Sequence, residues 1–164
     1  MTFEIRNADH NDFAAITDIA HRTWPVTYQN ILSKPQLDYM LELFYSESGL
    51  QKATENGQKF LLLSDSDVAV GFGSYEVKDP LSVKINKLYV LPDRQGKGYG
   101  KLLLDEIEKR AVELDAQQLI LNVNRNNKAI DFYKHLGFSI TGSEDIDIGN
   151  GYFMMDYIMA RQIP

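Results

Sequence analysis

Three glycines at alternate positions, Gly96, Gly98 and Gly100, separate a strand-like segment from a helix-like segment of this 164-residue chain. The first N–H groups of a helix are unpaired and carry partial positive charge, so they can bind an anion such as a phosphate. Glycines let an anion approach the backbone, and Lys97 and Lys101 add positive charge. The spacing matches neither a P-loop nor a dinucleotide-binding fold. The alternative interpretation is a strand-to-helix turn without a ligand.

The segments on either side of these glycines have clear patterns. Val83 to Val90 is rich in β-branched and aromatic residues and is closed by a proline, which predicts a strand. Apolar residues at helical spacing follow the glycines and predict a helix that runs to about Leu114. The apolar run from Leu119 to Asn124 predicts a buried strand. A crossover helix of this kind joins parallel strands, so this strand should lie parallel to the first.

Two longer motifs resemble the GNAT superfamily of N-acetyltransferases. The stretch from Leu88 to Lys101 is similar to the family's central motif, Gln/Arg-x-x-Gly-x-Gly/Ala, through Gln95, Gly98 and Gly100. Residues 126–138 resemble its closing motif, Asn-x-x-Ala-x-x-x-Tyr-x-x-x-Gly-Phe. The resemblance covers most of the chain. It implies one α/β domain over residues 1–164, with a twisted mixed sheet of about seven strands flanked by helices on both faces.

The same resemblance implies acetyl-CoA as co-substrate. Its pyrophosphate would lie on the backbone of the glycine segment, and its pantetheine arm would pair with the central strand where this strand parts from its parallel neighbour. Either Asn126 or Asn127 would hold the cofactor, because the interval before Ala129 is one residue shorter than the commoner pattern. The cofactor-binding residues implied are Leu88, Tyr89, Val90, Gln95, Gly96, Lys97, Gly98, Tyr99, Gly100, Lys101, Asn126 and Asn127.

Tyr133 occupies the position of the family's usual proton donor to the leaving sulfur. A phenol with a pKa of about 10 is protonated at neutral pH and can donate to a thiolate. The alternative is a tyrosine that only packs. The position of the family's usual general base has no carboxylate in this chain. Many family members place a glutamate near the start of the central strand, where Lys84, Ile85 and Asn86 stand here. The remaining sources are Glu76 and ordered water.

The acceptor pocket is expected between the first two strands, in a segment that contains Trp24, Tyr28 and Tyr39; the alternative is that these residues pack the core. Parting of the two central strands would also expose Asn122. An acidic loop could attract a cationic amine or assist its deprotonation, although a solvated loop is the simpler interpretation. The substrate-binding candidates are Trp24, Tyr28, Tyr39, Glu76, Asn122, Asp145 and Asp147.

Composition narrows the classes of function. Apolar residues are 44% and charged residues 24%, as in soluble globular domains, and the net charge of −6 without a basic stripe argues against a nucleic-acid partner. There is no cysteine, and the three scattered histidines do not suggest a metal site. Neither a membrane span nor a signal peptide is visible, so we expect a cytoplasmic protein without a membrane partner. A homodimer is compatible with the sequence.

The remaining elements follow from periodicity and turn residues. Trp24-Pro25 is expected to interrupt the first helix, because proline lacks an N–H. The other expected elements are an edge strand at Phe3–Arg6, a helix after Asn11 or Asp12, a helix from Ser33, strands at Lys59–Ser64 and Val68–Glu76, a helix at Asn127–Leu136, strands at Phe138–Thr141 and Tyr152–Met159, and a loop at Ser143–Gly151.

The leading hypothesis is an acetyl-CoA-dependent N-acetyltransferase that acts on a primary amine. The segment Trp-Pro-Val-Thr-Tyr at 24–28 resembles the branch with bacterial polyamine acetyltransferases, so a small cationic amine is the expected partner. A protein N-terminal or lysine acetyltransferase is one alternative. A non-catalytic acyl-CoA sensor is the other; the missing carboxylate on the central strand favours it, whereas Tyr133 speaks against it.

Overall fold

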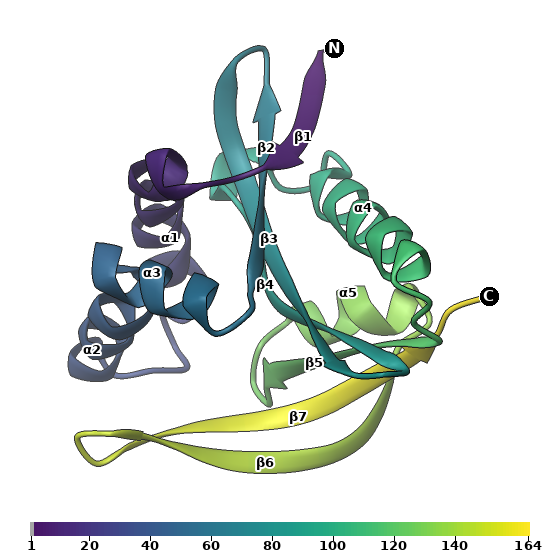
Figure 1. Cartoon of the computed structure of the whole chain (residues 1–164). Helices are drawn as coiled ribbons and strands as arrows, with labels where there is room; N and C mark the ends of the chain where they lie inside the picture. The colour runs from purple at the N-terminus through teal and green to yellow at the C-terminus, as the bar shows by residue number, and fades with distance from the viewer. Residues whose placement is uncertain (1) are drawn as a thin grey trace.

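The computed structural model describes residues 2–164, which form a seven-stranded mixed sheet with helices on both faces (Figure 1). This confirms the predicted fold class. Helices α1, α2 and α3 cover one face, and α4 and α5 cover the other. The elements are β1 (Phe3–Asn7), α1 (Phe13–Thr27), α2 (Lys34–Tyr45), α3 (Glu47–Glu55), β2 (Lys59–Asp65), β3 (Val68–Asp79), β4 (Ser82–Val90), α4 (Tyr99–Glu113), β5 (Gln118–Asn124), α5 (Ala129–His135), β6 (Ser139–Gly149) and β7 (Tyr152–Gln162).

The strand order is β1-β2-β3-β4-β5-β7-β6, and β4 with β5 is the parallel pair, as α4 crosses between them. Every other neighbouring pair is antiparallel. The centre of the sheet is buried on both faces: Phe72 lies under the N-terminal helices, while Leu103 and Ile107 of α4 close the opposite face. Each such side chain contributes about 1.5–3 kcal/mol when it leaves water.

The parallel pair opens into a fork. Its last partners are Ile85 and Leu121, although β4 continues to Val90 and β5 to Asn124. A bulge accompanies the opening, since Ser74 pairs with Lys87 and Tyr75 with Ile85, which leaves one extra residue on β4. A bulge bends and twists its strand, which directs the upper half of β4 away from β5. The predicted divergence of the two strands is confirmed.

Two predictions about the N-terminal half were wrong or incomplete. Pro25 does not interrupt α1, because it lies in the last turn, where its missing N–H removes one helical bond while the N–H of Tyr28 still reaches the carbonyl of Trp24 at 2.9 Å. Helix α3 was not predicted. Its start is marked by Ser46, whose hydroxyl accepts a hydrogen bond from the N–H of Gly49 at 3.1 Å.

The expected acidic loop at Ser143–Gly151 is also wrong, because most of it belongs to β6. Ile146 and Ile148 alternate with aspartates there, and the strand pairs with β7 throughout. The reversal is a short turn at 149–151, in which all three residues have positive φ. Glycine at two of these positions makes the tight hairpin possible. Strand β7 is longer than predicted, and α5 begins only at Ala129, whose N–H donates to the Asn127 side chain.

Candidate active site

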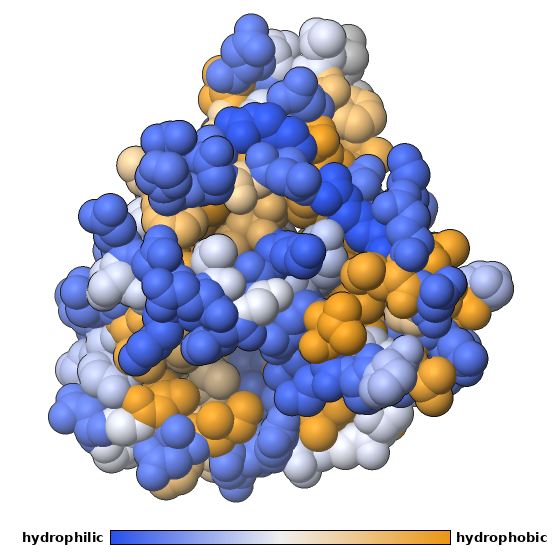
Figure 2. Space-filling model, viewed as in Figure 1, coloured by the Kyte–Doolittle hydropathy of each residue, from blue (hydrophilic) through white to orange (hydrophobic). Residues whose placement is uncertain are grey.

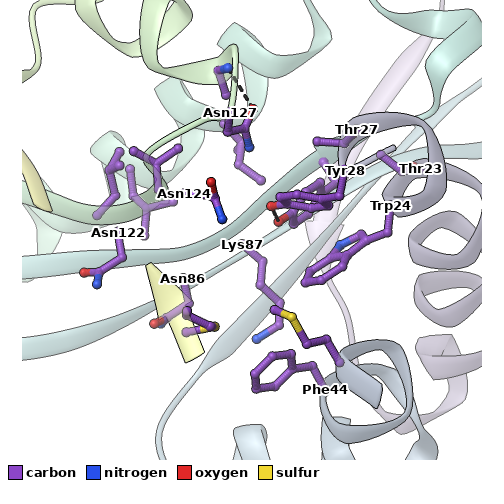
Figure 3. A pocket seen from close by; sticks show the side chains of 18 of the residues that line it. Thr23, Trp24, Thr27, Tyr28, Phe44, Asn86, Lys87, Asn122, Asn124 and Asn127 are labelled. Atoms are coloured by element: carbon purple, nitrogen blue, oxygen red, sulfur yellow. Dashed lines mark hydrogen bonds between the residues drawn. The ribbon is translucent and has the colours of Figure 1, made fainter. Parts of the chain in front are cut away.

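The fork opens into a cleft of about 1360 Å³ between the two helical layers. Figure 3 shows its interior, with Trp24 from α1, Tyr28 directly after this helix, Lys87 from β4, and Asn122 and Asn127 from the β5 side. Polar residues cover most of the face seen in Figure 2, and apolar residues form separate patches there. The lining of this one cleft includes the open ends of β4 and β5, the glycine loop, and aromatic residues such as Trp24 and Tyr28.

The glycine loop has the geometry of an anion cradle. Gly96 and Gly98 adopt φ of +80° and +84°, and a Cβ added at either would meet no atom within 4 Å, so the space before this backbone is open. Helix α4 begins directly after Gly98 and has no side-chain cap. Glycine is needed at position 100 for a different reason, because a Cβ there would lie 3.3 Å from the Phe132 ring of α5. The residues present therefore fit a pyrophosphate on the start of α4.

Two contacts fix this loop to the sheet. The side-chain amide of Gln95 donates to the carbonyl of Val90 at 3.1 Å, so this side chain connects the loop to the end of β4. Asp65, at the end of β2, accepts a hydrogen bond from the Tyr99 hydroxyl and lies 3.7 Å from the Arg94 guanidinium. The Tyr99 hydrogen bond, with a smaller contribution from Arg94, lowers the pKa of Asp65. Lys101 lines the cleft, whereas Lys97 does not.

An aromatic wall separates the cofactor side of the cleft from the core. The hydroxyls of Tyr28 and Tyr89 lie 3.0 Å apart, and the Trp24 ring packs on both tyrosines. Burial raises the pKa of both tyrosines, so they stay neutral. The indole Nε1 of Trp24 is buried without a partner among residues 2–164. Trp24 and Tyr28 thus pack the core and line the cleft at once, which joins the two interpretations of these residues.

Tyr133 lies on α5, packed edge-to-face against Phe132 and Phe138, and it lines the cleft. Its hydroxyl makes no hydrogen bond with another described residue. Burial is the main cause that raises its pKa, so the group is a neutral O–H donor. Asn126 and Asn127 both line the cleft beside it. The carbonyl oxygen of the Asn127 side chain already accepts from the N–H of Ala129, at 2.8 Å.

The opposite end of the cleft holds charged groups that the motifs did not indicate. Asp156 of β7 is buried and accepts a hydrogen bond from Asn122 at 3.3 Å, and Asn122 also donates to Glu144 at 2.8 Å. Burial raises the pKa of Asp156. Lys87 of β4 donates to Gln58 at 2.8 Å, and burial lowers its pKa to about 8. The sequence feature that could have indicated Asp156 is its position as the single charged residue in the otherwise apolar segment from Tyr152 to Ala160.

The other expected site residues lie outside the cleft lining. Tyr39 bridges α2 to the β6–β7 hairpin, where its hydroxyl donates to the carbonyl of Ile148 at 2.6 Å. Glu76 pairs with Lys84 in the sheet. Asp145 forms an ion pair with Arg125. Asp147 accepts from the N–H of Gly149 at the hairpin turn. The remaining cofactor candidates, Leu88, Tyr89, Val90, Gln95, Gly96, Gly98, Tyr99 and Gly100, all line the cleft with Lys101.

This fold and site define a GNAT acetyltransferase. The sequence model of the Acetyltransferase (GNAT) family matches residues 13–138, so the chain belongs to that family and is an N-acetyltransferase. The spermidine N(1)-acetyltransferase of Thermoplasma acidophilum is 26% identical over 153 residues, covering 90% of this chain and 94% of that protein. The peptidyl-lysine N-acetyltransferase YjaB of Salmonella typhimurium is 27% identical over 162 residues, covering 96% and 99%.

A solved acetyltransferase structure that contains coenzyme A has the same fold as this chain. The PaiA N-acetyltransferase from Thermoplasma acidophilum, in complex with coenzyme A, superposes with a TM-score of 0.83 and 26% identity over 99% of both chains. Within residues 2–164, no cluster of three or more metal-ligating side chains is present. The helices in this part of the chain are all too short or too polar to cross a membrane.

Proposed function

We propose that this enzyme transfers the acetyl group of acetyl-CoA to a primary amine of a small cationic acceptor of the polyamine type. The observation that carries the acceptor class is the buried carboxylate of Asp156, which no lysine, arginine or histidine of the described residues pairs in an ion pair. Glu144 adds a second negative charge through their shared partner Asn122. A cationic amine would balance this charge inside the cleft.

The architecture of the cleft supports a small acceptor. Helix α2 is tied to the β6–β7 hairpin by the Gln36 amide, which donates to the carbonyl of Phe153 at 2.9 Å, and by the Tyr39 hydroxyl bond to Ile148. Gln36 and Phe153 both line the cleft, so this bridge bounds its acceptor end. A slender, flexible amine can enter such a bounded space, whereas the surface of a folded protein is held further away.

The remaining groups have separate tasks. The backbone of the glycine loop would hold the pyrophosphate, and the open edge of β4 would pair with the pantetheine arm. Acetyl-CoA supplies an activated acyl group. Tyr133 would donate a proton to the sulfur that leaves, and Trp24 and Tyr28 would exclude water from one side. In this proposal the acyl donor would lie on the α5 side of the cleft and the amine on the β7 side.

A thiol-release assay tests the acceptor class. The chain contains no cysteine, so a thiol reagent detects released coenzyme A and not the protein, and the rate that depends on added amine measures transfer. We expect spermidine, spermine and putrescine to be acetylated with higher kcat/KM than a lysine-containing peptide or a peptide with a free N-terminus. Transfer to peptides alone would contradict the proposal and favour a protein acetyltransferase. Tight binding of acetyl-CoA without transfer to any amine would indicate a sensor.

A further inference from the structure

The carboxylate of Asp156 lies where the parallel strands separate. Asn86 and Asn122 are the first residues beyond the last paired positions of β4 and β5, and Asp156 is opposite Asn124 on the adjoining strand β7. All of these residues line the cleft. The amide nitrogen of Asn86 is buried and has no partner among the described residues, so the fork contains a polar group that is ready for a ligand.

Asp156 differs from the other acidic residues of the hairpin. The residue is only 6% exposed, and one of its carboxylate oxygens accepts a hydrogen bond from the Asn122 amide. Asp145 is neutralised by Arg125, and Asp147 is exposed at the turn. The backbone carbonyl of Asp156 accepts from the Arg125 Nε at 3.1 Å, which fixes this point of β7 without neutralising the carboxylate.

We propose that Asp156 is the base that removes a proton from the amine, so that the catalytic carboxylate of this enzyme comes from β7 and not from β4. The inference rests on the proposed function, because it assumes that the amine arrives as an ammonium ion. It accounts for the positions near the start of β4, where Lys84, Ile85 and Asn86 provide no carboxylate. Ammonium and carboxylate would meet at the fork, beside the open edge of β4.

The protons balance through two groups of this chain. The ammonium gives its first proton to Asp156, which passes it to solvent, and the freed nitrogen forms a bond to the thioester carbonyl carbon. The bond from that carbon to sulfur breaks, and the electron pair leaves with the sulfur. Tyr133 donates a proton to the sulfur and is restored by the second proton of the nitrogen. The products are an amide, free coenzyme A and one proton in solvent.

The surroundings of Asp156 tune this role in opposite directions. Burial and the neighbouring Glu144 of β6 favour the protonated carboxyl, whereas Asn122, Lys84 of β4 and Arg125 favour the carboxylate. The neutral Tyr28, at the C-terminal end of α1, lies near it on the side of the helical layer. A general base works best when its pKa is raised above that of an exposed aspartate, and burial together with Glu144 shifts the pKa of Asp156 in that direction.

The test compares two kinds of amine with one variant. In Asp156→Asn, kcat/KM for spermidine at pH 7 should fall by about 10²- to 10⁴-fold, the range for a positioned base. For an alkoxyamine, which is uncharged at pH 7 and needs no initial deprotonation, the fall should be much smaller. Asp147→Asn is the matched control, because its asparagine can still accept from Gly149 and the residue lies outside the cleft. It should leave both activities unchanged.

A second measurement does not depend on the activity of any variant. In wild-type enzyme with coenzyme A bound, the carboxyl carbon resonance of Asp156, assigned by its loss in Asp156→Asn, should move when spermidine is added. Equal losses for both amines, or an unmoved resonance, would overturn the role of Asp156. Should Asp156→Asn fail to fold, the resonance alone decides, with assignment through Asn122→Ala. A wild-type enzyme that acetylates the alkoxyamine or a peptide but no cationic amine would instead refute the proposed acceptor class, and this role with it.

Discussion

At the scale of single residues, two hydroxyl groups of similar burial have different surroundings. The Tyr28 hydroxyl is satisfied by Tyr89 at 3.0 Å, whereas the Tyr133 hydroxyl faces the cleft without a partner among the described residues. Burial raises the pKa of Tyr133, so its phenol is protonated at neutral pH and its hydroxyl can donate a hydrogen bond into the cleft. Because its hydroxyl is not already engaged by a neighbour, we propose Tyr133, and not Tyr28, as the donor to sulfur.

Tyr133→Phe should separate catalysis from binding. The variant keeps the ring between Phe132 and Phe138, so acetyl-CoA affinity and folding should change little. Turnover should fall by about 10²- to 10⁴-fold, because the leaving sulfur loses its proton donor. Thiol release at saturating spermidine measures turnover, and calorimetry measures affinity. Turnover close to wild type would remove Tyr133 from the reaction, and Tyr28→Phe serves as the control for loss of another phenol that lines the cleft.

Lys87 should make the binding of cations depend on pH. Burial lowers its pKa to about 8, so it is charged below that pH and neutral above it. The charged form repels a cation in the same cleft, and the affinity for a permanently charged quaternary ammonium amine should therefore rise several-fold as the pH passes from 7 to 9. In Lys87→Met this rise should vanish. Calorimetry across that range gives the affinities, and a variant with the wild-type pH profile would contradict the assignment.

At the scale of elements, sequence could predict what is local. The strand before the glycines, the three glycines and α4 follow one another in the sequence. Their residue patterns therefore predict both the elements and the order in which these elements border the cleft. Asp156 could not be found in this way, because its approach to Asn122 depends on β7 pairing with β5, far away in the sequence. The acidic residues at Ser143–Gly151 favour a loop when they are considered alone, whereas their alternation with Ile146 and Ile148 is typical of the strand that forms.

Gly98→Val tests the glycine loop as an element. A side chain at φ of +84° costs about 1–2 kcal/mol in stability and would also fill the open space before the start of α4. Gly151→Val is a matched control, since Gly151 has φ of +80° and equally open surroundings in the hairpin turn. Both variants should lose similar stability in thermal unfolding, but only Gly98→Val should lose acetyl-CoA binding. Equal affinities in the two folded variants would dismiss the cradle.

At the scale of the whole molecule, the cleft is closed by parts from opposite ends of the chain. The helices α1–α3 come from its first third and the β6–β7 hairpin from its last quarter, and α2 contacts the turn end of this hairpin (Figure 1). The Tyr39 hydroxyl lies 2.7 Å from the place where a Cβ of residue 149 would stand, so this contact needs the glycine found there. Tyr39 thus shapes the acceptor end from outside the lining.

Tyr39→Phe should loosen this closure without touching the reacting groups. The lost hydrogen bond to Ile148 costs about 1 kcal/mol, so amides at the hairpin turn should exchange with solvent about five-fold faster. The KM for spermidine should rise while kcat stays near wild type, because Tyr133 and Asp156 are unchanged. The kcat/KM for lysine peptides should increase relative to that for spermidine as the bounded end opens.

Tyr152→Phe is the control, since its ring packs on Tyr39 at 5.3 Å but its hydroxyl makes no hydrogen bond with described residues. Unchanged hydrogen exchange in Tyr39→Phe, or a fall in kcat instead of a rise in KM, would show that the α2–hairpin bridge does not control access to the cleft.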